Sequence, residues 1–511
     1  MKRLSICMVA LGLLFIAGDL FAAAKKETTP GKRQNKETIV IAFPSDARSL
    51  DPHATNDQPS ARVMKQIYDT LMHQTEDLQI KNGLVKEYRI VNPTQYDFTL
   101  HQGVKFHNGE ELKASDVKFT FERMREVKAP GAFLIAALDG ITVTGPYTFT
   151  AKLKYPFGPF LTHLAHTATS ILNEKAVKAA GANYNRNPVG TGPFKFTEWK
   201  PGVSITLERY DAYYQGPAKS AKIIFRVISE NAQRAIAIET AEADIAYDID
   251  ARDFNNLKNK PGIIGLQDRG LSTAYMGFNV KKKPFDNVKV RQAINYALNT
   301  ESAIQVLWQG AAIRPKSPLA PNVQFARTDL PGYPYDPAKA KQLLAEAGYP
   351  NGFKTTIWTN DNPVRIRYAE IFQEQLRQVG IETSIEILEW ASYLNRTAAG
   401  EHDMFILGWV AVTGDADYGM YSLFHSSQFG DAGNRTFYAN PEVDRLLDEG
   451  RTSTDNEKRR QAYFKAQELI MNEAPWVFMY IQDLLTLTRS YVKGFKNHTA
   501  GHHRLYEVYN E

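Results

Sequence analysis

The chain has 511 residues, of which 43% are hydrophobic and 23% are charged, an ordinary composition for a soluble globular protein of about three domain-sized units. The formal charge is +5, and all of this excess lies in residues 1–36, so residues 37–511 are neutral overall. This balance argues against a nucleic-acid-binding protein, whose folded part normally carries a strong basic bias. The single cysteine, Cys7, excludes an intrachain disulfide and a cysteine-based metal site.

The N-terminus has the order of regions that is typical of a secretory signal peptide. Lys2 and Arg3 precede an apolar run over 4–16, and alanines follow at 22–24. This run is too short for a permanent membrane span, which makes an uncleaved anchor the weaker alternative. Cys7 lies inside the run, too early to carry a lipid after cleavage. We therefore predict a signal peptide at 1–24, a disordered polar leader at 25–36, and a periplasmic protein that is not a lipoprotein.

The next part of the chain alternates strands with short helices and turns. The patterns predict strands at 38–43 and 96–100, helices at 60–72, 115–124 and 232–241, and a strand at 223–228. The glycine-rich stretch at 187–194 is not a phosphate loop, because no Gly-Lys-Ser/Thr follows and a strand pattern begins at Pro193. We expect it to lead into a hairpin that pairs 194–198 with 204–208.

From about residue 275 the pattern changes to repeated strand–helix units. The predicted elements are strands at 276–280, 354–359 and 381–388, and helices at 287–298, 337–347, 365–379, 390–398, 441–449 and 455–472. Asp336 and Pro337 are typical of a helix start, and Gly348 of a helix end. A strand at 476–481 then returns the chain to its first part. These units favour an α/β fold with helices covering a sheet.

The stretch from Met404 to Tyr418 begins as a short apolar strand and becomes a loop with two carboxylates and two aromatic residues. Gly408 inside the strand pattern is typical of a place where another backbone comes close, and Trp409 adds a large face with one donor. An extended ligand could pair with such a strand edge. The alternative is an ordinary core strand followed by a solvated acidic loop.

Arg365 and Arg367 follow Asn362-Pro363 in the first turn of a predicted helix. The helix dipole does not favour cations there, whereas two arginines at a helix N-terminus could hold a carboxylate through paired N–H···O bonds. The alternative is a pair of solvated surface arginines.

No enzyme motif stands out. The chain has no Gly-x-Ser-x-Gly, no His-Glu-x-x-His and no phosphate loop, and no cysteine nucleophile survives signal cleavage. His163 and His166 could share a helix face but have no third ligand in sequence. We therefore predict no catalytic residues, no cofactor and no metal site.

The order of motifs from about residue 37 onward resembles the peptide-binding branch of bacterial ABC-transporter solute-binding proteins, the dipeptide and oligopeptide receptors of family 5. The resemblance rests on Ser49-Leu50-Asp51-Pro52, Phe106-His107-Asn108-Gly109, Ala114-Ser115-Asp116-Val117, Val189-Gly190-Thr191-Gly192-Pro193-Phe194, Val290-Arg291-Gln292-Ala293-Ile294 and Gly408-Trp409. Any one of these motifs is weak, but together they are specific.

The resemblance implies a two-lobed periplasmic-binding-protein fold of class II, with an extra subdomain in the first lobe. The expected boundaries are 37–274 for lobe I, 56–190 for its subdomain, 275–480 for lobe II and 481–511 for a return to lobe I. Ligand would be enclosed between the lobes by hinge closure. The implied binding segments are Ser49–Leu50 in lobe I and Gly408, Trp409 and Val410 in lobe II, with Arg367 aligning best to a carboxylate-holding arginine and Arg365 close by.

One position departs from the dipeptide and oligopeptide receptors. Their aspartate three residues after the tryptophan, which pairs with the peptide amine, is Val412 here. Thr413-Gly414-Asp415-Ala416-Asp417-Tyr418 instead looks like the pattern of glutathione-binding members. In glutathione one carbon carries both an amine and a carboxylate, so Asp415 or Asp417 could take the amine while an arginine takes the carboxylate.

The resemblance therefore implies a monomeric, non-catalytic subunit that captures short peptides or glutathione and delivers them to a membrane permease. The pore and the ATPase must be other chains. Two alternatives remain open at this point: a receptor for haem or a nickel chelate on the same fold, and a periplasmic hydrolase.

Overall fold

The structure is a computed structural model that describes residues 37–511. The signal peptide and leader predicted at 1–24 and 25–36 lie outside the described residues. Among the described residues, no helix has both the length and the apolar character needed to cross a membrane.

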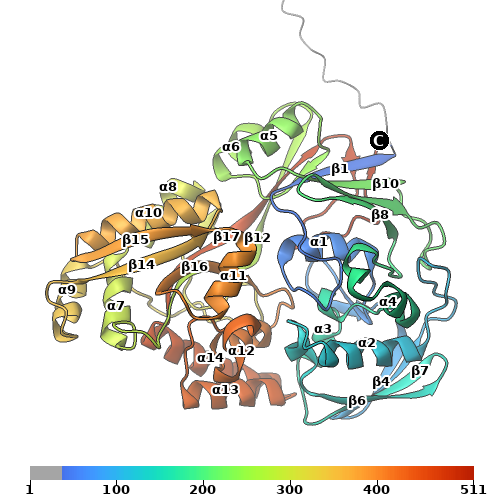
Figure 1. The fold of residues 1–511 in the computed structure, drawn as a ribbon, viewed down its shortest axis with the longest axis horizontal. Helices are drawn as coiled ribbons and strands as arrows, with labels where there is room; N and C mark the ends of the chain where they lie inside the picture. The colour runs from blue at the N-terminus through green and yellow to red at the C-terminus, as the bar shows by residue number, and fades with distance from the viewer. Residues whose placement is uncertain (1–36) are drawn as a thin grey trace, which may run out of the picture.

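The fold has two lobes, as predicted, and one large mixed sheet runs through both (Figure 1). Its strand order is β15 (Ile381–Leu388), β14 (Phe353–Asn360), β16 (Met404–Val410), β12 (Ile263–Phe278), β17 (Trp476–Arg489), β11 (Ile245–Ala246), β1 (Thr38–Phe43), β10 (Lys222–Val227), β9 (Ser204–Arg209) and β8 (Phe194–Lys200), while β13 (Ala312–Ile313) pairs with β17. The hairpin predicted at 194–208 is confirmed as β8–β9.

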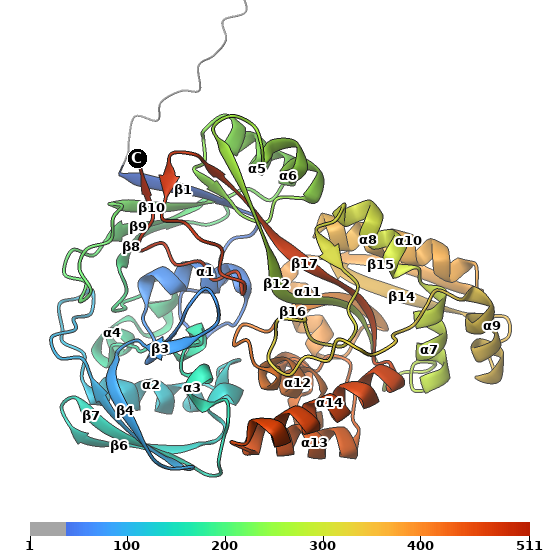
Figure 2. The ribbon, with the colours of Figure 1, turned by 180° about the vertical axis from the view of Figure 1, so that it is seen from behind.

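The strands β12 and β17 connect the lobes. They have 16 and 14 residues and pair antiparallel from Ile263↔Arg489 to Gly277↔Trp476. Register shifts interrupt the pairing between Arg269 and Thr273 and at Ala274. Figure 2 shows both strands passing from one lobe to the other. The lobe boundaries predicted at 274/275 and 480/481 fall inside these two strands.

The first lobe combines the β1 end of the large sheet with smaller units. The central β1 pairs parallel with β10 and β11. A separate four-stranded sheet, β4 (Val85–Asn92), β5 (Gln95–Leu100), β7 (Thr148–Leu153) and β6 (Leu138–Gly145), lies beside α2 (Ala114–Glu126). The other helices are α1 (Gln58–Ile67), α3 (Phe160–His163), α4 (Glu174–Ala180), α5 (Asn231–Glu239) and α6 (Ala251–Leu257), and β2 (Met72–Gln74) pairs with β3 (Ile80–Asn82). The helix predicted to reach Met72 ends at Ile67, because Met72 already belongs to β2.

The second lobe contains the predicted strand–helix units. Its helices are α7 (Val288–Ala297), α8 (Thr300–Trp308), α9 (Pro337–Glu346), α10 (Pro363–Arg377), α11 (Trp390–Ala398), α12 (Ala416–Phe424), α13 (Pro441–Thr452) and α14 (Asn456–Glu473). The predicted helix start at Asp336-Pro337 is confirmed at α9, where the Asp336 side chain accepts from the Lys339 amide. The helix α10 begins at Pro363, two residues before the predicted start, because Asn362 caps it by accepting from the Arg365 amide.

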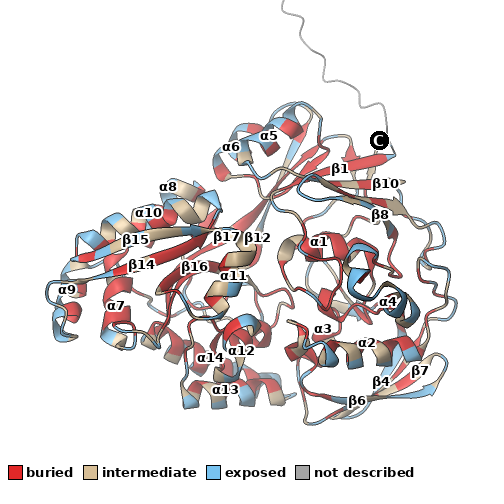
Figure 3. Cartoon of the chain, in the orientation of Figure 1, coloured by how far each residue is buried: buried red, intermediate tan, exposed pale blue. Residues whose placement is uncertain are grey.

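The central strands β1 and β17 of the large sheet are buried over most of their length, whereas the outer strands β15 and β8 are largely half-buried or exposed (Figure 3). One apolar cluster contains residues of both lobes, such as Phe133 and Phe160 from the first and Tyr418 and Leu446 from the second. Since burial of apolar surface stabilises a contact in proportion to area, this shared cluster holds the lobes together.

Candidate functional site

Two cavities lie where the lobes meet, and both are lined by residues of each lobe. The first encloses about 1210 Å³ and the second about 1000 Å³, counting the space that opens to solvent. They share five lining residues: Gln58, Ser272, Arg365, Gly408 and Val410. Because these shared residues lie between the cavities, we describe the two as one central cleft.

The strand β16 offers an open backbone edge to this cleft. On one side it pairs with β12 through Val410, but on the other side β14 reaches only as far as Phe405. The Ala411 amide donates to the Leu271 carbonyl on β12. Along an antiparallel strand, the backbone N–H and C=O groups of successive residues point alternately toward the partner strand and away from it. Gly408 and Val410 therefore direct these groups away from β12. Ile406 does the same, and its carbonyl accepts from the Tyr393 hydroxyl.

Gly408 leaves room at this edge. A Cβ built on it would lie 3.4 Å from the Thr273 carbonyl oxygen and 3.6 Å from Arg365 Nη2, which are ordinary contacts. The fold therefore does not require glycine here for lack of space. The absence of a side chain at Gly408 leaves the strand edge and the Arg365 guanidinium accessible side by side.

Arg365 lies at the first turn of α10 and faces the cleft. Its Nη1 donates to Asn360 Oδ1 at 2.9 Å, and its guanidinium carbon lies 5.7 Å from the centroid of the Trp390 ring. Within residues 37–511 no carboxylate lies within ion-pair distance of Arg365. Its charge therefore remains available for an anion that enters the cleft.

Arg367 is on a different face of the same helix. Two helical positions differ by about 200°, so Arg365 and Arg367 cannot point the same way. Arg367 is exposed and lines a separate, more open hollow with Glu230 and Asp250. The structure thus brings Arg365, and not Arg367, to the central cleft.

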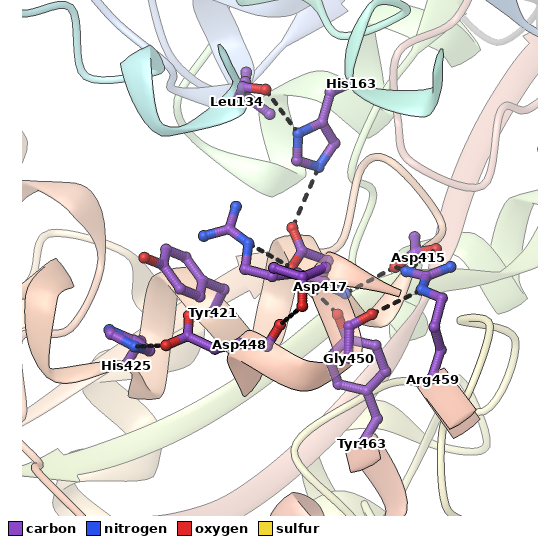
Figure 4. A network of polar contacts seen from close by, with 12 residues as sticks. Leu134, His163, Asp415, Asp417, Tyr421, His425, Asp448, Gly450, Arg459 and Tyr463 are labelled. Atoms are coloured by element: carbon purple, nitrogen blue, oxygen red, sulfur yellow. Dashed lines mark hydrogen bonds and ion pairs between the residues drawn. The ribbon is translucent and has the colours of Figure 1, made fainter. Parts of the chain in front are cut away.

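The loop predicted to run to Tyr418 is instead the start of α12, and its two aspartates, Asp415 at the N-cap and Asp417 in the first turn, lie in a buried ionic network (Figure 4). Asp415 caps α12 by accepting from the Asp417 amide, and both its oxygens accept from Arg459 Nη2, at 2.7 and 2.9 Å. Asp417 lies 3.3 Å from Arg451 Nε and accepts from the Tyr463 hydroxyl at 3.2 Å. Burial is the largest single influence on Arg459 and lowers its pKa, but Asp415, Tyr463 and Asp417 together more than offset it, so the pKa of Arg459 is raised.

The same network reaches the first lobe. His163 Nε2 lies 3.5 Å from Asp417 Oδ2, and the His166 ring lies within hydrogen-bond distance of the Tyr418 hydroxyl. Burial lowers the pKa of His166 to about 3, so this histidine is neutral. The Thr413 carbonyl accepts from the Gln74 side chain of the first lobe. Thr413, Asp417 and Tyr418 therefore link the second lobe to the first.

Ser49 and Leu50 are buried inside the first lobe and line neither cavity. The Ser49 hydroxyl accepts from the Asp51 amide, the Ser49 amide donates to the Ser60 hydroxyl, and the Leu50 carbonyl accepts from the Tyr68 hydroxyl. These bonds fix the loop that precedes α1. The first-lobe residues that do line the cleft include Gln58, on α1 itself.

The sequence motifs missed a second charged pair in the cleft. Asp431 and Arg435 line the second, smaller cavity together with Trp390 and Trp409. The Trp409 indole N–H has no hydrogen-bond partner within residues 37–511, so it is a further free donor. Arg435 follows Gly433-Asn434 in an irregular loop, where no periodicity marks a residue as inward-facing. No group of three or more His, Cys, Asp or Glu side chains in the described part is arranged to hold a metal ion.

Comparison with known proteins gives consistent results. The model of "Bacterial extracellular solute-binding proteins, family 5 Middle" matches residues 79–431. The glutathione-binding protein GsiB of Pectobacterium atrosepticum is 34% identical over 467 residues, covering 89% of this chain and 91% of that protein. The GsiB protein of Salmonella typhi is 32% identical with the same coverage.

Solved structures agree with the family match. The periplasmic binding protein DppA from Helicobacter pylori, in complex with the peptide STSA, has a TM-score of 0.88 and 31% identity, covering 93% of this chain and 98% of that one. NikZ from Campylobacter jejuni, in complex with Ni(L-His), has a TM-score of 0.85 and 25% identity, covering 93% and 100%. The chain belongs to the bacterial extracellular solute-binding proteins of family 5.

Proposed function

We propose that this protein captures glutathione or short peptides in the periplasm and delivers them to the permease of an ABC importer. The observation that carries the proposal is the open edge of β16 beside the unpaired Arg365 in a cleft between two lobes. The relatives named for glutathione binding are more similar to this chain than the nickel-binding neighbour, which favours a peptide-like ligand over a metal chelate.

The backbone of the ligand pairs with β16 as an added strand. Gly408 and Val410 supply the backbone groups, and Trp409 supplies an apolar wall and its indole donor. Main-chain pairing recognises any peptide-like backbone, so it accounts for affinity without fixing the sequence of the ligand.

Arg365 holds a ligand carboxylate. A guanidinium can make two parallel bonds to a carboxylate, and the low-dielectric cleft strengthens them. Asp415 and Asp417 act indirectly, because their oxygens are already engaged by Arg459, Arg451 and Tyr463. They, Thr413 and the Ser49–Leu50 loop position the walls of the cleft.

Binding closes the lobes about β12 and β17, where register shifts interrupt the pairing. A ligand stabilises the closed form only by its differential affinity for the two forms. The protein performs no chemistry on the ligand, acts as a monomer, and depends on other chains for the pore and the ATPase.

Native mass spectrometry of the gently purified protein tests this proposal, followed by calorimetry with reduced glutathione, oxidised glutathione and a set of dipeptides. We expect a co-purifying peptide or glutathione, saturable heat, and recovery of the ligand unchanged. The absence of heat with every one of these ligands, or release of cleaved products, would contradict the proposal.

A further inference from the structure

We propose that Asp431 and Arg435 form a recognition site for a free α-amino acid head group, in which Arg435 holds the carboxylate and Asp431 the ammonium group of one carbon. This inference rests on the proposed function and narrows it to γ-glutamyl peptides. Such peptides carry this head group at one end and a second carboxylate, suited to Arg365, at the other.

The first observation is that Arg435 is buried without adequate partners. Its side chain is 8% exposed, and its Nε has no hydrogen-bond partner in the described part of the chain. Burial lowers the pKa of Arg435, because neighbouring groups offset only part of the lost solvation. A buried guanidinium is costly unless paired, so a ligand carboxylate at this position would supply what the protein does not.

The second observation is the position of Asp431. Its Oδ1 lies 3.6 Å from Arg435 Nη2, which is too long for a hydrogen bond, and its side chain is 77% exposed. The two residues are four positions apart and both line the second cavity. Asp431 therefore has free acceptor oxygens next to the Arg435 guanidinium. Such oxygens are what is needed to bind a ligand ammonium group while the guanidinium binds the carboxylate on the same carbon.

A second guanidinium in the same cavity points to the second carboxylate. Arg365 and Arg435 line the same cavity. Burial raises the pKa of the Tyr275 and Tyr393 hydroxyls, and both charges act against this larger effect by lowering it. Asp57, the other carboxylate in this wall, is engaged by the amide and hydroxyl of Ser60 at the start of α1. Among the charged side chains that line this second cavity, two guanidiniums and one carboxylate thus keep unused capacity.

This set complements glutathione group for group. Glutathione has two carboxylates and one ammonium, and the ammonium shares a carbon with one carboxylate. In an α-linked peptide that carboxylate is consumed by the peptide bond, so the N-terminal carbon offers Arg435 no anion. The geometry therefore favours a γ-linked N-terminal glutamate over an α-linked one.

The test removes each half of the head group from the ligand and from the protein in turn. Calorimetry on the full-length mature protein uses reduced glutathione, its glutaryl analogue without the ammonium, its 4-aminobutyryl analogue without the α-carboxylate, and α-linked Glu-Cys-Gly. We expect each of the last three to bind the unchanged protein at least about tenfold more weakly than glutathione, as the loss of a charged hydrogen bond predicts.

The variants Asp431→Asn and Arg435→Gln complete a double-mutant cycle. Asp431→Asn should abolish the discrimination against the glutaryl analogue and retain that against the 4-aminobutyryl analogue, and Arg435→Gln should do the reverse. Asp329→Asn is the matched control, because Asp329 is an exposed aspartate paired with Arg327 outside the cleft. It should bind all four ligands like the unchanged protein.

Two results would overturn the inference while leaving peptide capture intact. One is equal affinity of the unchanged protein for glutathione and both truncated analogues, and this comparison holds even if Arg435→Gln does not fold. The other is tight binding of α-linked peptides with none of glutathione. If none of the four ligands nor any dipeptide binds, the proposed function fails together with the inference.

Discussion

The second lobe contains two sets of charged residues close together in sequence, and they differ in how far their charges are paired. Asp415 and Asp417 are buried and engaged by Arg459, Arg451 and Tyr463. Asp431 and Arg435, by contrast, line the cleft at a distance that is too long for a hydrogen bond. Buried charges that are closely paired hold the fold together, whereas charges that are only loosely paired beside a cavity keep capacity for a ligand.

The largest effect should come from breaking the paired set. Arg459→Ala leaves Asp415 buried without its cation, which typically costs about 3–5 kcal/mol of unfolding free energy. Denaturant unfolding of the ligand-free protein measures this loss. Arg460→Ala is the neighbouring control, because its partner Glu457 is exposed on the surface and the unfolding midpoint should not change. Equal midpoints for the two variants would show that the network does not stabilise the fold.

The next effect concerns the unpaired cation of the cleft. Arg365→Ala should weaken binding of glutathione or peptide by about ten- to hundredfold, since a hydrogen bond to a charged group contributes about 1.5–3 kcal/mol. The melting temperature of the ligand-free protein should change little, because Arg365 has no ion-pair partner within residues 37–511 and the variant loses only its hydrogen bond to Asn360 and its contact with the Trp390 ring. Arg367→Ala, on the exposed face of α10, should leave the affinity unchanged. The opposite pattern would reassign the carboxylate to Arg367.

Two glycines of neighbouring strands separate binding from folding. Gly408→Val should lower the affinity for the ligand by roughly tenfold, because it displaces a main-chain hydrogen bond, and it should cost little folding stability. Gly277→Val should instead destabilise the fold by about 1–3 kcal/mol through overpacking, because its Cβ would meet the Phe405 ring. Thermal unfolding and calorimetry on both variants distinguish the two outcomes, and equal destabilisation of both would contradict the open edge at Gly408.

The smallest effect is the pH dependence contributed by His166. Its pKa is lowered to about 3 in the fold by burial, so the unfolded chain binds a proton first as the pH falls. The free energy of unfolding is therefore highest above about pH 6.5 and falls progressively below it, by about 1.4 kcal/mol at pH 5.5. Unfolding at pH 7.5 and 5.5 measures this slope, and His166→Gln should reduce it. An unchanged slope would show that His166 keeps its solution pKa.

The sequence predicted local structure and the family well, for a local reason. Asn362-Pro363 and Asp336-Pro337 mark helix starts through contacts within one turn, and the alternation of apolar residues sets which face of each strand is buried. The strand that contains Gly408 was predicted in the same way, whereas the close approach of a ligand backbone to this glycine stays a prediction.

The partners of the charged side chains were decided by the tertiary structure alone. Asp415 meets Arg459 only because α14 packs beside α12, and no pattern near Asp415 indicates that its carboxylate is already paired. Whether Arg365 or Arg367 lines the cleft depends on which face of α10 is turned toward it. Arg435 reaches the same cleft from an irregular loop. Ion pairs form through space between residues that are far apart in the chain. The sequence therefore shows which charged residues are present, and only the fold determines which of them remain available to a ligand.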